Sequence, residues 1–339
     1  MSISCVSAEE KRKESEEAAA ATAIMARDEK IGIVGSGFIG QSWAMLFASV
    51  GYQVRIYDAN PDQISSALDN IKKQLKTLKE SGLLRGKLTA DQQIQCIKAA
   101  SDLKDCVEGA KFVQESVFED MEVKKKVFQE IDEFAGPKTV LASSTSCIVP
   151  SKFTADLAHK ENCIVSHPVN PPYYVPMVEV VPAPWTSKET VNMTRAILKE
   201  IGQSPVVFTK EQPGFGANRI QYAILNECHN MVTNGILSAE DVDALIRDGL
   251  GYRYAWMGPL ETALLNANGM EDYMDRYGST INNISKLLGP TPSWKKEDSK
   301  ILCSQLESWL PTEKLQERRE WRDVRLIALY KLKRDMKDN

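Results

Sequence analysis

Short apolar runs alternate with amphipathic segments from residue 30 to about residue 210. The apolar runs have the length of buried strands and occupy residues 30–34, 53–57, 111–117, 139–142, 163–165, 177–181 and 205–209. Segments between them repeat apolar residues at helical spacing, as at 41–50, 121–134 and 188–201. Strands that alternate with helices indicate an α/β fold, and we expect a doubly wound, Rossmann-like sheet.

One polar stretch, residues 62–110, is long for a crossover between two strands. It contains two helical patterns, at 63–80 and 89–100, which a glycine-containing turn joins. We expect a helical hairpin outside the sheet, with its lysines on a solvated face.

The chain changes character after residue 211, where strand patterns stop and helical patterns continue to the end. This change predicts a Rossmann domain at 29–211 and an all-α domain at 212–339. Residues 1–28 are rich in Glu, Lys, Ser and Ala and lack the apolar stretch of a secretory signal. We expect a disordered tail there.

Three glycines, Gly35, Gly37 and Gly40, form a GxGxxG motif directly after the first strand and at the start of a helix. In this context the glycines allow a tight turn, close approach of pyrophosphate and close packing of helix on strand. Asp58 ends the next strand, 18 positions after Gly40, where a carboxylate accepts hydrogen bonds from ribose hydroxyls and repels a 2′-phosphate. The motif therefore predicts a dinucleotide site that prefers NAD to NADP.

Polar residues also follow two later strands of the expected sheet. Glu119 and Lys124 come after the strand at 111–117, and four hydroxyl residues, 143–146, end the strand at 139–142. Ligands bind at the carboxyl ends of such strands. We expect Glu119 and Lys124 to contact the cofactor, while the hydroxyls form either a helix cap or a polar wall of the site.

His167 lies between two short apolar runs, and Glu179 lies inside the second of them. A carboxylate in a buried strand is costly unless it is paired, and an imidazole is a suitable partner. The pattern therefore favours a catalytic His–Glu pair as much as a structural histidine with Glu179 facing solvent. Four prolines between the two residues predict a rigid connection.

Composition excludes several other classes of function. The formal net charge of −4 and the pI near 5.7 give no general attraction to nucleic acid. No apolar run approaches the roughly 18–20 residues of a membrane span. Seven scattered cysteines show no metal-ligand spacing, so we expect no metal site, and free thiols suit a reducing compartment such as the cytoplasm.

Taken together, several motifs resemble the 3-hydroxyacyl-CoA dehydrogenase family, and most closely its branch of lambda-crystallin and L-gulonate 3-dehydrogenase. The resemblance covers the chain from about residue 30 to its end. The motifs are the glycine loop at 34–40, Ser-Ser-Thr-Ser-Cys at 143–147, His-Pro-Val-Asn-Pro-Pro-Tyr-Tyr at 167–174, Gly-Leu-Gly-Tyr-Arg-Tyr-Ala at 249–255 and Arg-Glu-Trp-Arg-Asp at 319–323.

The resemblance implies a role for each matching residue. The family's catalytic histidine and glutamate fall on His167 and Glu179, its active-site serine on Ser146 and its asparagine on Asn218. Ser146 and Asn218 would also hold the substrate oxygen. The residues expected to contact NAD are Gly35, Gly37, Phe38, Ile39, Gly40, Asp58, Glu119 and Lys124.

Two departures from the acyl-CoA members cast doubt on an acyl-CoA substrate. Ser144 and Pro168-Val169 replace residues usual there, and Arg253 is inserted in a Gly-Tyr-Pro-Met-Gly-Pro motif. A guanidinium suits a free carboxylate, which a thioester lacks. We therefore expect Arg253 to bind a small 3-hydroxy acid, although a local ion pair with Asp248 or Glu261 is the alternative.

These expectations lead to one candidate function and several alternatives. The first candidate is NAD-dependent oxidation of L-gulonate to 3-dehydro-L-gulonate; the alternatives are a 3-hydroxyacyl-CoA or carnitine dehydrogenase, or a crystallin-type structural protein. The family implies a homodimer through the helical domain. Apolar residues at helical spacing within 317–337 indicate a packing or dimer face.

Overall fold

The computed structural model describes residues 27–336, and these form two compact units. The first unit extends to Asn218 and also contains the residues from Arg325 onward, while Arg219–Val324 form the second. This division differs from the expected one, because the C-terminal residues belong with the first unit and the boundary follows residue 218 rather than 211. The expected tail, residues 1–28, lies almost wholly outside the described residues.

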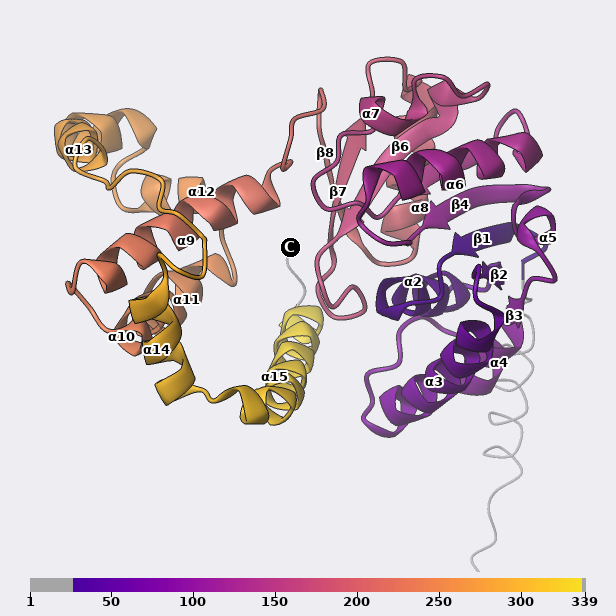
Figure 1. Ribbon diagram of the computed structural model, residues 1–339, viewed down its shortest axis with the longest axis horizontal. Helices are drawn as coiled ribbons and strands as arrows, with labels where there is room; N and C mark the ends of the chain where they lie inside the picture. Colours follow the sequence, from indigo (N-terminus) through magenta and orange to yellow (C-terminus); the bar gives the residue numbers. More distant parts are fainter. Residues whose placement is uncertain (1–26, 337–339) are drawn as a thin grey trace, which may run out of the picture. The chain divides into compact units, whose positions relative to one another are not determined.

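The first unit is built on an eight-stranded sheet with the order β3-β2-β1-β4-β5-β6-β7-β8 (Figure 1). All neighbouring strands are parallel except β6 and β7, which are antiparallel. The fold class expected from the alternating pattern is therefore confirmed. The strands are β1 (Lys30–Val34), β2 (Gln53–Tyr57), β3 (Ile97–Ala99), β4 (Ala110–Glu115), β5 (Val140–Ser143), β6 (Cys163–Pro168), β7 (Met177–Pro182) and β8 (Ser204–Val207).

Helices cover both faces of this sheet, and each face has its own cluster of buried side chains (Figure 1). The first cluster contains residues of α2 (Phe38–Ala48), α3 (Pro61–Glu80), α4 (Ala90–Cys96) and α8 (Lys188–Glu200). The second contains residues of α5 (Leu103–Val107), α6 (Met121–Phe134) and α7 (Ser151–Thr154). This double covering explains why most of the strands are apolar throughout.

The polar excursion contains the two expected helices, α3 and α4, but the second ends earlier than its pattern predicted. α4 ends at Cys96, and the next three residues form β3, which pairs with β2 at the edge of the sheet. The expectation of a helix over 89–100 was therefore wrong at its end. Hydrogen bonds from β2 turn Ile97–Ala99 into a strand that is too short to show its own period.

The second unit is entirely helical in the described residues. Its helices are α9 (Ala217–Thr233), α10 (Ala239–Ala244), the π-helical turn η2 (Leu245–Leu250), α11 (Gly251–Tyr254), α12 (Pro259–Leu265), α13 (Met270–Ser285), α14 (Lys300–Trp309), the 3-10 turn η3 (Thr312–Lys314) and the first part of α15 (Leu315–Met336). Its buried cluster is small and consists of Val232, Ala239 and Val242. Between residues 27 and 336 no helix combines the length and apolar character that a membrane crossing requires.

Arg85, in the connection between α3 and α4, is a buried cation that joins several distant segments. Its guanidinium donates to the carbonyl oxygens of Tyr173 (3.0 Å), Ile201 (3.0 Å) and Gly202 (2.6 Å). The last two carbonyls follow α8, so the charge lies at the C-terminus of a helix, where the helix dipole favours a cation. The ring of Tyr330, on α15, lies 5.3 Å from the guanidinium carbon.

Replacing Arg85 with methionine should destabilise the first unit, because the carbonyl oxygens of Tyr173, Ile201 and Gly202 would lose this donor and the first two are in buried contacts. We expect a loss of about 2–4 kcal/mol in the free energy of unfolding, measured by urea denaturation. Arg334→Met is the matched control, since Arg334 is exposed and, among the described residues, forms an ion pair with the neighbouring Asp335 alone. Equal stability of both variants would contradict the role assigned to Arg85.

Candidate active site

The three motif glycines, two before α2 and one in its first turn, meet three different steric requirements. Gly35 has a φ of 103°, which side chains rarely adopt, and a Cβ at Gly40 would collide with the carbonyl oxygen of Gly35. A Cβ at Gly37 would meet no described atom within 4 Å. The N-terminus of α2, with Phe38 and Ile39 in its first turn, therefore faces open space where an anion such as pyrophosphate is favoured.

Asp58 follows β2 and holds the glycine loop in place. Its Oδ2 accepts hydrogen bonds from the backbone N–H and the hydroxyl of Ser36, both at 2.8 Å, and its Oδ1 accepts one from the N–H of Asn60 at 3.0 Å. The same carboxylate lines a cavity of about 480 Å³ together with Gly35 and Gly37. Ser36 was not among the residues expected at this site.

Lys124 is buried and directs its ammonium group toward two carboxylates. Its Nζ lies 3.0 Å from Oε1 of Glu115 and 3.3 Å from Oε2 of Glu119. Glu115 is fully buried in β4 and also accepts hydrogen bonds from the N–H of Val117 (2.7 Å) and the hydroxyl of Ser143 (2.5 Å). Glu115 was not among the expected site residues, although it is a carboxylate inside an apolar strand, as Glu179 is.

The side chain of Glu119, which follows β4, contacts the loop that follows β5. Its Oε1 accepts hydrogen bonds from the Thr145 hydroxyl (2.6 Å) and from the N–H groups of Ser146 (2.8 Å) and Cys147 (3.3 Å). Burial alone would raise the pKa of the Glu119 carboxyl, but these donors and Lys124 outweigh burial and lower that pKa. Glu119 therefore remains ionised at neutral pH and fixes the backbone that carries Ser146.

His167 and Glu179 lie directly opposite each other on the antiparallel strands β6 and β7. His167 Nδ1 lies 2.7 Å from Oε2 of Glu179. Because an ionised carboxylate only accepts, Nδ1 carries the proton and Nε2 carries a lone pair. No described residue forms a hydrogen bond with Nε2, and the His167 side chain is 12% exposed, so this nitrogen is available to a ligand.

The remaining oxygen of Glu179 is bound by the start of α9. Oε1 accepts hydrogen bonds from the N–H groups of Gly216 and Ala217, both at 2.8 Å. Burial, to 2% exposure, would raise the pKa of the Glu179 carboxyl, but the bonds from His167, Ala217 and Gly216 together lower it. The carboxylate is therefore ionised near neutral pH and stabilises a proton on the imidazole.

Asn218 and Ser146 lie close together in the first unit. The amide Nδ2 of Asn218 donates to the carbonyl oxygen of Ser146 at 2.7 Å. Ser146 is half-buried, and its hydroxyl also lies 3.2 Å from Glu119 Oε1. The structure thus brings together Ser146, Asn218 and Glu119, while His167 and Asn218 are linked through Glu179 and the first turn of α9.

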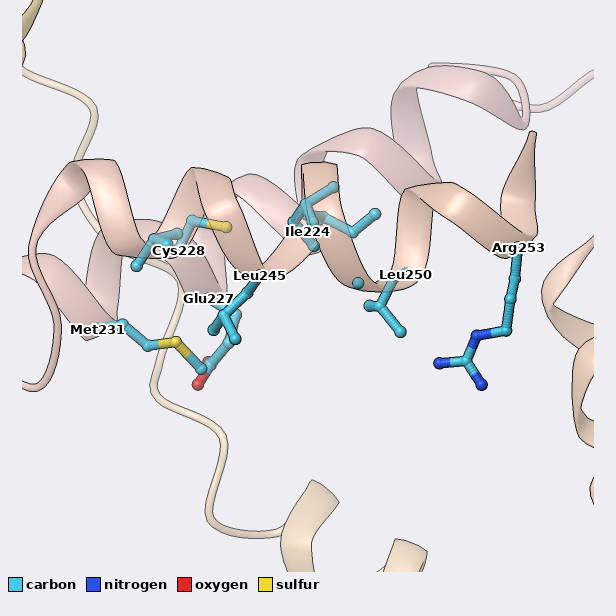
Figure 2. A pocket seen from close by; sticks show the side chains of 10 residues that line it. Ile224, Glu227, Cys228, Met231, Leu245, Leu250 and Arg253 are labelled. Atoms are coloured by element: carbon cyan, nitrogen blue, oxygen red, sulfur yellow. The ribbon is translucent and has the colours of Figure 1, made fainter.

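Arg253 belongs to α11 in the second unit and lines an apolar cavity of about 470 Å³ (Figure 2). Neither Asp248 nor Glu261 forms an ion pair with Arg253 in the described residues, since Asp248 pairs with Arg247 at 2.6 Å. In Figure 2 the Arg253 guanidinium stands apart from the side chains of Cys228 and Met231, at the opposite end of the group of lining residues.

Comparison with known proteins identifies the family. The model of the 3-hydroxyacyl-CoA dehydrogenase NAD-binding domain matches residues 30–212, and the model of the C-terminal domain of the same family matches residues 214–292. The chain belongs to the 3-hydroxyacyl-CoA dehydrogenase family. It is an NAD-binding oxidoreductase with the family's two domains, and the glycine loop and Asp58 lie in the matched NAD-binding domain.

Proteins similar to this chain carry names that refer to different functions. Lambda-crystallin of Oryctolagus cuniculus is 47% identical over 90% of this chain and 96% of its own length. L-carnitine dehydrogenase of Oceanobacillus iheyensis is 32% identical over 75% of this chain and 81% of its own. The structure of 5-formyl-3-hydroxy-2-methylpyridine 4-carboxylic acid 5-dehydrogenase, an NAD⁺-dependent dismutase, superposes with a TM-score of 0.76 at 29% identity, covering 90% of this chain and 98% of that one.

Gly37→Ala should weaken NAD binding without affecting folding. The added methyl group would meet no described protein atom but would occupy space that the pyrophosphate needs. We expect the Kd for NAD to rise at least roughly tenfold, by titration calorimetry, with an unchanged thermal midpoint. Gly40→Ala is the control that should instead lower the thermal midpoint, because its methyl group collides with backbone. Wild-type affinity in Gly37→Ala would contradict this assignment.

Glu179→Gln should lower stability at neutral pH but not in acid. Because the folded-state pKa of Glu179 lies below the unfolded value of about 4.3, ionised Glu179 stabilises the fold above that pH, and this contribution is lost as pH falls through the folded pKa. At pH 7 we expect the variant to lose about 1–3 kcal/mol in the free energy of unfolding, measured by urea denaturation. The difference from wild type should become smaller below a pH of about 4. The exposed control Glu122→Gln should match wild type. A pH-independent difference would refute the explanation.

Proposed function

We propose that this protein is an NAD-dependent 3-hydroxy acid dehydrogenase, with L-gulonate as the first candidate substrate and 3-dehydro-L-gulonate as the product. The observation that carries the proposal is the pairing of His167 Nδ1 with Glu179, because it leaves Nε2 free to take a proton. A general base of this kind accelerates reactions roughly 10²–10⁴-fold.

In the proposed reaction, His167 Nε2 takes the proton of the substrate hydroxyl as the carbinol carbon loses hydride. When bound, NAD⁺ supplies the acceptor for that hydride. The imidazolium that forms keeps its Nδ1–H bond to Glu179, whose lowered pKa keeps its negative charge in place. In the reverse direction the imidazolium returns its proton to the carbonyl oxygen.

We assign Ser146 and Asn218 to orientation of the substrate oxygen. Asn218 donates to the backbone of Ser146, so the two residues are fixed relative to each other. Glu119 holds the Ser146 backbone N–H at 2.8 Å and reduces the freedom of this loop. Hydrogen-bond donors that are held in place before the reaction stabilise developing charge on oxygen without reorganisation.

For the substrate carboxylate we propose Arg253 as the partner. Support comes from its guanidinium, which forms no ion pair with a described carboxylate, although Glu227 lines the same cavity. A guanidinium also offers two parallel N–H donors, which match the two oxygens of a carboxylate. The similar pyridine carboxylic acid dehydrogenase is named for a substrate with a carboxylate, which is compatible with a hydroxy acid substrate here. The relative named for L-carnitine, another substrate class that carries a hydroxyl and a carboxylate, makes carnitine the alternative.

We also propose that two chains associate through the helical unit. Large apolar side chains of that unit are more than half exposed, among them Ile220, Tyr252, Leu260, Leu265 and Leu287. Exposed apolar side chains of this size and the small buried cluster support an interface with a second chain. The described cysteines are all free, which supports the cytoplasm as the proposed location.

A substrate panel combined with Arg253→Met tests the proposal. NADH formation should be fastest with L-gulonate among gulonate, 3-hydroxybutyrate, carnitine and 3-hydroxybutyryl-CoA. In Arg253→Met, kcat/KM for gulonate should fall roughly 10–100-fold, as expected for loss of a charged hydrogen bond, while the value for 3-hydroxybutyryl-CoA should not fall.

The matched control is Arg247→Met in the same unit, because Arg247 is exposed and pairs with Asp248. It should retain the wild-type kcat/KM for gulonate. An unchanged gulonate value in Arg253→Met would reject the carboxylate role. If the protein prefers carnitine or the thioester, that compound becomes the proposed substrate in place of gulonate. If it turns over none of the compounds, a structural role is favoured.

A further inference from the structure

Phe215 occupies the turn before α9 in a conformation that its side chain disfavours. Its φ is 49°, and no other non-glycine residue among those described has a positive φ in this structure. Glycine would adopt this conformation without steric cost, whereas a side chain with a Cβ is strained there. The side chain is nevertheless 1% exposed and belongs to the second buried cluster. The turn thus retains a large aromatic residue where glycine would fit the backbone better.

The Phe215 ring contacts the candidate base directly. Its centroid lies 5.8 Å from that of the His167 ring, with an angle of 53° between the planes. The next two residues, Gly216 and Ala217, donate their N–H groups to Oε1 of Glu179. One short turn therefore touches both the imidazole and the carboxylate that binds it.

A hydrogen bond to Nδ1 fixes only one atom of the imidazole. The ring can still tilt about that bond, and a tilt displaces Nε2, the atom that faces a ligand. Packing of a second ring against the imidazole removes this freedom, as side chains that support a functional group commonly do.

We infer that Phe215 is a positioning residue for His167. Glu179 selects the tautomer of the imidazole, and Phe215 sets the plane of the ring and hence the direction of Nε2. This inference rests on the proposed function, since the direction of Nε2 matters for turnover only where His167 is the base. It also accounts for the strained φ, which places the Phe215 ring at His167 while the N–H groups that follow reach Glu179.

Two substitutions separate positioning from simple structure. Phe215→Gly relieves the backbone conformation and removes the ring, whereas Phe215→Leu keeps an apolar side chain but removes the flat face. Both should lower kcat roughly 10–100-fold with the KM for NAD changed less than about twofold, because a misplaced base slows the chemical step. Wild-type kcat in both variants would overturn the inference.

A double variant tests whether the effect passes through His167. In a His167→Gln background, adding Phe215→Leu should change the residual kcat by less than about twofold, since contacting residues that act as a unit are not additive. The same fold-loss in both backgrounds would show that Phe215 acts elsewhere and would overturn the inference.

A spectroscopic measurement keeps the inference testable if the protein oxidises none of the hydroxy acids, an outcome that rejects the proposed function alone. The chain has only three histidines, so long-range ¹H–¹⁵N spectra of the full-length protein resolve few imidazoles. Wild-type His167 should show a protonated Nδ1 and an unprotonated Nε2, and both variants should shift these signals toward a tautomer average. Unchanged His167 signals in Phe215→Leu and Phe215→Gly would refute the positioning role.

Discussion

The carboxylate of Glu179 is the contact on which the candidate site depends. One oxygen binds His167 Nδ1, and the other accepts two N–H groups at the start of α9. A buried carboxylate is costly unless its oxygens are satisfied, and here three donors satisfy them. The same contacts place the first turn of α9, which carries Asn218, next to the loop of Ser146. The carboxylate of Glu179 therefore links His167 to the two residues that we propose for binding the substrate oxygen.

The neighbouring part of the sheet repeats this arrangement with different partners. Glu115 is buried in β4, and Lys124, Ser143 and the N–H of Val117 satisfy it. Lys124 in turn contacts Glu119, which binds the Ser146 backbone. Two buried acids, Glu115 and Glu179, thus hold the residues at this edge of the sheet in place. Lys124 therefore pairs with both carboxylates and helps to hold Glu119 in place.

Seven of the eight strands and the His–Glu pair could be predicted from the sequence, because both follow from burial. Apolar runs mark strands that helices cover on both faces, and a glutamate inside such a run requires a partner. What fixes the pair is the antiparallel register of β6 and β7, which sets His167 opposite Glu179. The four prolines predicted only a rigid connection between the two residues, because register depends on a pairing that no local pattern contains. β3 was missed for a related reason: its three residues become a strand only beside β2.

The C-terminal helix shows the same limit of local patterns. Apolar residues at helical spacing predicted that one face of α15 packs against something, but they did not identify the partner. In the structure Ile327 packs against the first buried cluster, and Tyr330 lies against Arg85, 245 positions earlier in the chain (330 − 85). A stripe of apolar residues records only that a face is covered. The choice of partner depends on groups such as the Arg85 guanidinium, whose charge is stabilised by carbonyl oxygens and an aromatic face, and an isolated arginine in a polar segment gives no sign of this in the sequence.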